Sequence, residues 1–265
     1  MDLGIAGRRA LVTGASRGIG AAIAQRLAAE GVRVVLVART AGDLERACAE
    51  IRTCGGDAIG IAANVATEDG RQRLLDAVRA EPCDILVNNV GGGTLKPFLD
   101  FTDQDWRDDL ERNLLSAVAL TSGLLPSMIA RGWGRIVHVG SIAAREPGHR
   151  AAPYAAAKAG LVAYSKATSA AVGRHGVLSV VVMPGLTDTS AIEARRQQLS
   201  EGAGGPELSR EQLASRLMGS RSAAIRRMIT PDDVAAAVLF LVSDRAQAVT
   251  GVALPVDGGT MLGVW

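Results

Sequence analysis

The residues Arg9-Ala-Leu-Val-Thr-Gly-Ala-Ser-Arg-Gly-Ile-Gly20 decide the fold that we predict for this chain. Arg9–Thr13 is a short apolar run that a glycine stops, which is typical of a buried strand. An apolar stripe at helical spacing then begins at Ile19 and ends at Gly31. The glycines of the turn between them allow a close backbone approach, and the helix start offers N–H groups to an anion. The stretch therefore predicts a strand–turn–helix unit that binds a diphosphate, although such a turn can also exist without a ligand.

The rest of the chain repeats this alternation of apolar runs and helical patterns. Further strands are predicted at 33–38, 58–62, 84–88, 135–139, 178–183 and 252–256. Helices are predicted at about 40–53, 67–80 and 102–131, from Pro153 onward, and at 231–242. Continuous apolar runs are typical of parallel strands that are buried on both sides. We therefore predict one α/β domain over 1–265, a Rossmann-like doubly wound sheet of about seven parallel strands with helices on both faces. Pro255 indicates that the last strand lies at an edge of the sheet or at the end of a ladder.

One segment, at about 190–229, interrupts this rhythm. It holds helical fragments at 191–199 and 210–218 around a glycine-rich stretch at 201–205. A long excursion after the carboxyl end of a strand is more often a lid or a substrate loop than a separate domain. We therefore expect a substrate-loop insert here.

Composition limits the class of partner. The chain has 265 residues and a net charge of +2, with acids and bases nearly balanced, so nothing favours nucleic acid or a membrane surface. The three cysteines match no metal-binding spacing, and we predict no metal site. No secretion signal and no run of about 18 apolar residues are found. We expect a cytoplasmic protein without a membrane span.

The pair Tyr154 and Lys158 suggests proton chemistry. Residues four apart share one face of a helix, so a phenol and an ammonium are held side by side. A neighbouring positive charge should lower the pKa of the phenol from about 10, which would suit a group that exchanges protons near neutral pH. Ser141 lies thirteen residues upstream. For such a pair alone, two exposed residues of an alanine-rich helix would be the favoured interpretation.

The residues after the second strand choose between cofactors. An acid about 20 positions beyond the glycine turn would bind the ribose 2′-hydroxyl of NAD. The chain instead reads Ala38-Arg39-Thr40. Arg39, together with Arg17 of the turn, could bind a 2′-phosphate, because a guanidinium pairs with phosphate in a bidentate manner. We therefore prefer NADP and keep NAD as the alternative. Both arginines could otherwise be solvated surface charges.

Taken together, these motifs resemble the short-chain dehydrogenase/reductase family, and most of all its 3-oxoacyl-[acyl-carrier-protein] reductases. The resemblance runs from Arg8 to Gly259, outside the insert. The matching motifs are Thr13–Gly20, Asn88–Gly91, Asn113, Ser141, Tyr154 with Lys158, Pro184-Gly185 with Thr189, and Val256–Gly259. The chain departs from the family pattern at Asn64-Val65, where Asp-Val is usual, at Val90, at Val180, and at Gly92-Gly93, which extend the glycine motif.

The resemblance implies four catalytic residues. Tyr154 would be the general acid, and Ser141 would bind the carbonyl oxygen. Lys158 would lower the pKa of the phenol and hold the nicotinamide ribose, while Asn113 would anchor a relay water. The implied cofactor-binding residues are Gly14, Ser16, Arg17, Gly18, Ile19, Gly20, Arg39, Asn64, Val65, Asn89, Gly91, Tyr154, Lys158, Pro184, Gly185, Thr187 and Thr189.

The implied activity is the NADPH-dependent reduction of a ketone, a 3-oxoacyl group or a similar small carbonyl. An acyl carrier or a coenzyme A thioester is a candidate carrier of that substrate. The alternatives are an NAD-dependent dehydrogenase that oxidises a secondary alcohol, and a cofactor-binding regulator without turnover. The family also implies a homotetramer or a homodimer. His149, between Ser141 and Tyr154, is a candidate for substrate contact.

Overall fold

A single seven-stranded parallel sheet forms the centre of the computed structural model, which describes residues 2–190, 192–193, 209, 212 and 223–263. Its strands are β1 (Arg9–Thr13), β2 (Arg33–Ala38), β3 (Ala58–Ala62), β4 (Ile85–Asn88), β5 (Gly134–Val139), β6 (Val177–Pro184) and β7 (Ala253–Val256). They lie in the order β3-β2-β1-β4-β5-β6-β7, and every pair is parallel. The predicted sheet is confirmed, and β7 with Pro255 lies at its edge.

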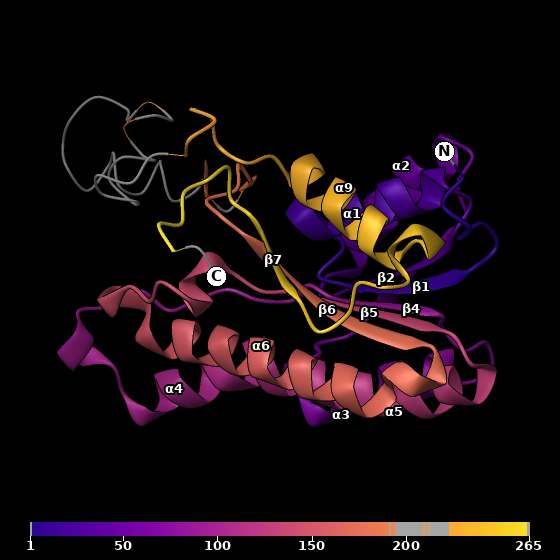
Figure 1. The fold of residues 1–265 in the computed structure, drawn as a ribbon, viewed down its shortest axis with the longest axis horizontal. Helices are drawn as coiled ribbons and strands as arrows, with labels where there is room; N and C mark the ends of the chain where they lie inside the picture. Colours follow the sequence, from indigo (N-terminus) through magenta and orange to yellow (C-terminus); the bar gives the residue numbers. More distant parts are fainter. Residues whose placement is uncertain (1, 191, 194–208, 210–211, 213–222, 264–265) are drawn as a thin grey trace.

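Helices cover both faces of the sheet (Figure 1). The helices are α1 (Gly18–Ala29), α2 (Ala41–Thr53), α3 (Glu68–Val78), α4 (Asp103–Leu110), α5 (Ser116–Arg131), α6 (Ala152–Val172) and α9 (Pro231–Val242). Short 3-10 turns are η1 (Phe98–Asp100), η3 (Ile142–Ala144), η4 (His149–Ala151), η5 (Gly173–His175) and η6 (Asp244–Ala246). In Figure 1, α1, α2 and α9 lie above the sheet and α3 to α6 below it.

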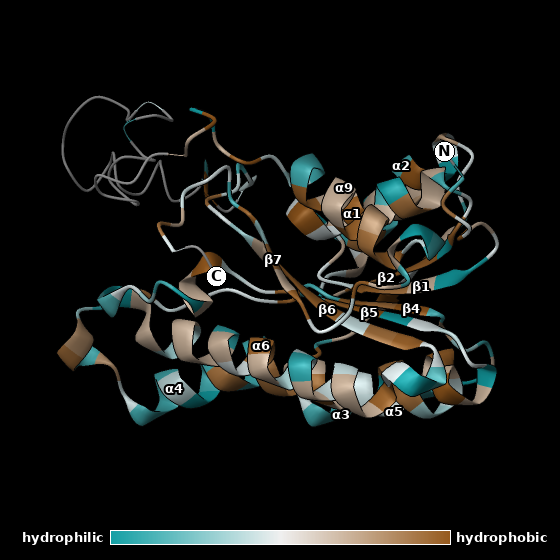
Figure 2. Ribbon diagram, viewed as in Figure 1, coloured by the Kyte–Doolittle hydropathy of each residue, from teal (hydrophilic) through white to brown (hydrophobic). Residues whose placement is uncertain are grey.

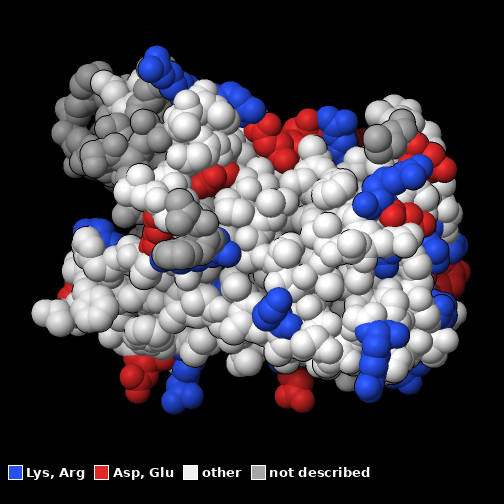
Figure 3. All heavy atoms as spheres, in the orientation of Figure 1, with Lys and Arg blue, Asp and Glu red and all other residues white. Residues whose placement is uncertain are grey.

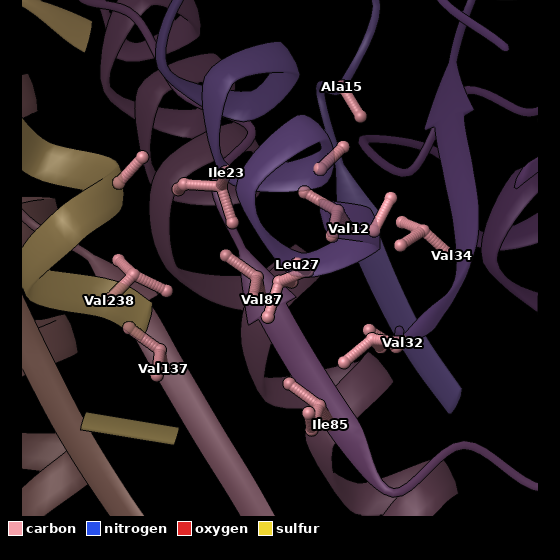
Figure 4. Packing of buried hydrophobic residues seen from close by; sticks show 14 of the residues in the cluster. Val12, Ala15, Ile23, Leu27, Val32, Val34, Ile85, Val87, Val137 and Val238 are labelled. Carbon is pink, nitrogen blue, oxygen red and sulfur yellow. The ribbon is translucent and has the colours of Figure 1, made fainter. Parts of the chain in front are cut away.

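The apolar core has two halves, one on each face of the sheet. Alternate strand residues point to opposite sides, so Val12 packs under α1 and α9 while its neighbour Leu11 packs on the other face. Figure 4 shows Val12 meeting Ile23 and Leu27 of α1, with Val238 of α9 nearby. Each fully buried side chain of this size stabilises the fold by about 1.5–3 kcal/mol. Figure 2 accordingly shows brown strands between helices that carry teal on their outer faces.

Threonine side chains cap the N-termini of three helices. The Thr67 hydroxyl accepts a hydrogen bond from the Gly70 amide at 3.2 Å. Thr102 forms a reciprocal capping box with Asp105, and Thr230 forms one with Asp233. Each cap of this kind stabilises the fold by about 1 kcal/mol.

The helix expected over 102–131 contains an irregular turn. Between α4 and α5, the residues Glu111–Leu115 form one π-helical turn, η2, which the sequence pattern did not predict. Among the described residues, the continuous stretch Asp103–Arg131 is long and apolar enough, by length and composition alone, to cross a membrane. Its apolar residues have another use here, because α5 packs against β5 and α3.

The insert predicted at 190–229 lies mostly outside the described residues, including both of its expected helical fragments. Its two ends are described, and they meet. Thr187 and Ile229 form a parallel bridge, in which the Asp188 amide donates to the Ile229 carbonyl at 2.7 Å. The chain therefore leaves and re-enters the sheet domain at one point.

Charged side chains are dispersed over the surface. On the face shown in Figure 3, basic and acidic groups lie scattered rather than gathered in a patch of one sign. This distribution agrees with the near balance of charge in the sequence.

Candidate active site

The predicted site residues gather at the carboxyl end of the sheet. The chain passes from β1 outward to β2 and β3 and then returns to β4 on the other side of β1. Ligands bind in such sheets at the point where the strand order reverses. The glycine turn follows β1, Asn89 follows β4 and Ser141 follows β5, so all three lie at this edge.

The glycine turn has a shape that only glycine allows. Gly14 and Gly18 have φ angles of +64° and +59°, in the left-handed region. A Cβ atom on Gly20 would lie 2.3 Å from the Gly14 carbonyl oxygen. The Asn89 side chain then fixes the turn from β4, because its Nδ2 donates to the carbonyls of Thr13 and Gly14 at 2.9 and 3.1 Å.

The N-terminus of α1 is open to an anion. Arg17 occupies the N-cap without a side-chain cap, and the first turn of the helix contains no acid. The first N–H groups of a helix lack partners within it and favour negative charge. Thr189 lies opposite, because a Cβ atom on Gly18 would lie 3.5 Å from its Cγ2 atom. Turn, helix start and Thr189 together fit the diphosphate of a dinucleotide.

The other candidates for the adenosine side lie near the ends of β2 and β3. Arg17 and Arg39 are exposed. Asn64 is exposed as well, and its Oδ1 accepts from the Ala66 amide at 3.2 Å. Val65 is buried among the core residues of β1 and β2. Ser16 and Ile19 are half-buried in the glycine turn.

The segment after β6 is held against the C-terminal part of the chain. The Gly185 amide donates to the Val256 carbonyl at 3.0 Å, and a Cβ atom on Gly185 would lie 2.9 Å from the Asp257 Cα. The buried Thr187 hydroxyl donates to the Gly185 carbonyl at 3.0 Å. Pro184, the last residue of β6, and Thr189 thus flank a rigid corner beside the glycine turn.

Ser141 and Tyr154 are hydrogen-bonded. Ser141 ends the β5 segment, and its Oγ also accepts from the Ala143 amide at 3.1 Å, which fixes the side chain. Burial raises the pKa of Tyr154 above its ordinary value, the hydrogen bond with Ser141 acts in the opposite direction, and the charge of Asp109 raises the pKa further. The prediction that Lys158 lowers this pKa is therefore wrong for the cofactor-free protein, because burial dominates.

Lys158 is buried below the phenol. Its Nζ donates to the Val139 carbonyl at 2.7 Å and lies 5.8 Å from the centre of the Tyr154 ring. Burial lowers the pKa of Lys158 to about 8, which weakens its positive charge near neutral pH. Gly91 brings the backbone against this group, since a Cβ atom there would lie 3.1 Å from Nζ.

Asn113 lies in the π-helical turn. Its Nδ2 donates to the carbonyls of Gly92 and Asp109, both at 2.9 Å, and its Oδ1 accepts from the Gly92 amide at 3.1 Å. Turns of this kind are often found at functional sites. Asn113 therefore holds the loop after β4 through both the amide and the carbonyl of Gly92. A part in a proton relay would be additional.

Sequence reasoning missed the part that two residues play. Asp109 is completely buried near Tyr154, and Gly93 lies against the phenol, where a Cβ atom would be 2.8 Å from the Tyr154 Cβ. The signal for Asp109 was its place four residues before Asn113, on the same inward face. His138 of β5 is a structural residue, which lies in the core with its Nδ1 atom 3.2 Å from the Asn88 Nδ2. Burial lowers the pKa of His138 to about 3.

Known proteins resemble the chain over almost its whole length. A sequence profile of short chain dehydrogenases matches residues 8–200. The 3-oxoacyl-[acyl-carrier-protein] reductase of Escherichia coli is 36% identical over 255 residues, which cover 96% of this chain and 97% of that protein. The short-chain reductase protein NovJ of Streptomyces niveus is 35% identical over 252 residues, covering 94% of this chain and 92% of that protein. L-sorbose reductase from Gluconobacter frateurii, solved with NADPH and L-sorbose, superimposes with a TM-score of 0.93 at 34% identity and covers 100% of both chains.

Proposed function

The chain belongs to the short-chain dehydrogenase family, which makes it an NAD(P)-dependent oxidoreductase, and within that family we propose that it is an NADPH-dependent ketone reductase. One observation carries the proposal. Ser141, Tyr154 and Lys158 lie at the same sheet edge as the glycine turn and the uncapped start of α1. This arrangement would bring a proton donor beside a dinucleotide site, and it supports the proposal.

The preference for NADPH rests on two arginines. Arg17 and Arg39 are exposed near the carboxyl ends of β1 and β2, where a 2′-phosphate would lie, and residue 38 is alanine rather than an acid. The solved relative with NADPH supports the same choice.

The proposed reaction divides the work between cofactor and protein. A nicotinamide cofactor held by the glycine turn would supply the hydride for the carbonyl carbon. The Tyr154 hydroxyl gives its proton to the carbonyl oxygen, and the Ser141 hydroxyl donates a hydrogen bond to that oxygen. The Lys158 ammonium, which donates a hydrogen bond to the Val139 carbonyl, would stabilise the Tyr154 phenolate by its positive charge. Asn113 keeps the neighbouring loop in place.

The protonation state of Tyr154 is compatible with its proposed role as the acid in reduction. A general acid must carry its proton at the working pH, and burial keeps the phenol protonated near neutrality. An alcohol dehydrogenase would need the same group as a base. The NAD-dependent dehydrogenase is the second candidate, and a regulator without turnover has no observation in its favour.

For the substrate, we propose a 3-oxoacyl thioester or a similar small ketone. The relatives include a 3-oxoacyl-[acyl-carrier-protein] reductase and a ketose reductase, and at about 35% identity they support the class rather than one compound. We further propose a homodimer or a homotetramer in the cytoplasm, with residues 190–229 acting as a substrate loop and His149 of η4 facing the substrate.

A cofactor-resolved assay tests the proposal. The purified protein is given NADPH or NADH with a 3-oxoacyl-coenzyme A, a ketose and a simple ketone, and the loss of nicotinamide absorbance is followed. We expect NADPH-dependent loss with at least one ketone. Oxidation of secondary alcohols with NAD alone would favour the dehydrogenase, and tight NADPH binding without turnover of any substrate would favour the regulator.

A further inference from the structure

Asp109 is a buried carboxylate that the proposed reaction does not use. It lies in the last turn of α4, and its side chain is completely buried. Its Oδ2 accepts from the Thr94 amide at 3.2 Å, while its Oδ1 has no hydrogen bond among the described residues. The guanidinium of Arg112 lies 3.8 Å from that oxygen. An incompletely compensated buried carboxylate is costly, so its position calls for an explanation.

Asp109 and Asn113 hold the same loop. Asn113 binds the amide and the carbonyl of Gly92, and Asp109 binds the amide of Thr94. Gly93, between these two anchored residues, is the one that lies against Tyr154. The two side chains are four residues apart and therefore share one helical face. Together they anchor the residues before and after Gly93, and so keep the loop in contact with Tyr154.

We propose that Asp109 is a positioning residue of the active site, which holds the Gly91–Thr94 loop against Tyr154 and places a negative charge near the phenol. The proposal rests on the function proposed above, because it gives Tyr154 the role of a proton donor. It assigns Asp109 no direct contact with substrate or cofactor.

The charged and titratable groups around Asp109 and Tyr154 come from four parts of the chain. Asp105, Asp108 and Arg112 of the helix that carries Asp109 act on its carboxylate, and Lys96 from the loop binds Asp105. Ser141 and Lys158 lie beside the phenol from β5 and α6. The negative charge of Asp109 raises the pKa of Tyr154. Burial also raises the pKa of Asp109 itself, so this effect fades in acid.

The chain offers a direct readout, because Tyr154 and Tyr164 are its two tyrosines. In a Tyr164→Phe background, the ultraviolet absorbance of tyrosinate reports the ionisation of Tyr154 alone. The titration is performed on the full chain without cofactor or substrate, so it gives an answer even if no substrate is ever turned over. A failure of the proposed function and a failure of this inference are thereby separated.

Three variants are titrated in that background. Asp109→Asn keeps an acceptor for the Thr94 amide but removes the charge, and we expect the Tyr154 midpoint to fall by about 0.5–1 pH unit. Asp108→Asn is the matched control, because its exposed carboxylate is next in the chain and binds only Gln104 among the described hydrogen bonds. An unchanged midpoint in folded Asp109→Asn, or an equal shift in the control, overturns the electrostatic role.

If Asp109→Asn does not fold, Arg112→Gln tests the effect of the Asp109 charge by removing the guanidinium that partly neutralises it. Loss of the guanidinium leaves the Asp109 carboxylate less neutralised, so the Tyr154 midpoint should rise. An unchanged or lowered midpoint overturns the proposal.

Amide hydrogen exchange tests the hold on the loop. Asp109→Val removes the acceptor, and we expect exchange at the Thr94 amide to become about tenfold faster or more, whereas Asp109→Asn should leave it close to wild type. Equal exchange in Asp109→Val and wild type overturns the positioning role.

Discussion

Gly93 lies so close to Tyr154 that a Cβ atom on the glycine would be 2.8 Å from the Cβ and Cγ atoms of the tyrosine. Contacts this short are essentially absent from folded proteins, so Gly93→Ala must displace either the loop or the phenol. A small misplacement of a catalytic group can cost about 100-fold in rate. We expect Gly93→Ala to lower kcat by about 10- to 100-fold while NADPH binding, measured by fluorescence titration, stays within about twofold.

Gly42→Ala is the control for that substitution. Gly42 lies in α2 with no atom within 4 Å of the position of an added Cβ, and alanine favours a helix more than glycine does. It should leave kcat unchanged. If Gly93→Ala behaves like Gly42→Ala, the loop does not position the phenol.

Tyr154→Phe should remove the proton donor and leave most of the structure intact. We expect kcat to fall by at least about 100-fold, the lower end of what a general acid contributes, with little change in NADPH affinity. Steady-state assays and a binding titration on the same preparation measure both. Turnover close to that of the wild type would rule out Tyr154 as the acid.

Lys158→Met should make the cofactor-free protein more stable at neutral pH. The pKa of buried Lys158 is lowered to about 8, so below pH 8 the folded state carries an ammonium that the unfolded chain holds more cheaply. At about 1.4 kcal/mol for each pKa unit, offset by the lost hydrogen bond to Val139, we expect a gain of about 1–3 kcal/mol in the free energy of unfolding.

This gain has a defined pH dependence. Between pH 8 and about 10.5 the folded protein releases the Lys158 proton before the unfolded chain does, so the wild type recovers stability as the pH rises. Denaturant unfolding at pH 7, 9 and 10.5 should show the advantage of Lys158→Met shrinking along this series. A constant difference would mean that the ammonium is not desolvated.

Arg39→Gln should weaken the preference for NADPH. Loss of one charge-assisted hydrogen bond to a phosphate costs about 1.5–3 kcal/mol, so the ratio of NADPH to NADH affinity should fall by about 10- to 100-fold. Arg46→Gln is the control, because Arg46 pairs with Asp43 on the outer surface of α2. Equal ratios in the two variants would show that Arg39 does not contact the 2′-phosphate.

The backbone of this fold could be predicted because its signals are local. Each buried parallel strand is a short apolar run, and each capped helix begins at a threonine or a proline, so the strand set and the edge position of β7 are as predicted. The glycine turn was predictable for the same reason, since Gly14, Gly18 and Gly20 need their conformations wherever the chain goes next.

The electrostatics of the site could not be predicted in this way. Tyr154 and Lys158 were expected to interact across one helix face, with the ammonium lowering the pKa of the phenol. Burial reverses that result, and burial depends on loops and helices that are distant in sequence. The π-helical turn at Asn113 and the contact of Gly93 with Tyr154 likewise depend on how α4, α6 and the loop after β4 meet.

The bridge between Thr187 and Ile229 has a consequence for how the sequence of this protein can evolve. Because these two residues are neighbours in space, the chain between them starts and ends at the same place. The number of residues in that segment therefore does not affect the register of β6. Doubling the length of such a segment costs only about 0.6 kcal/mol of closure entropy. The segment between the two bridge residues could therefore be replaced by one of different length and chemistry, while the catalytic residues stay unchanged.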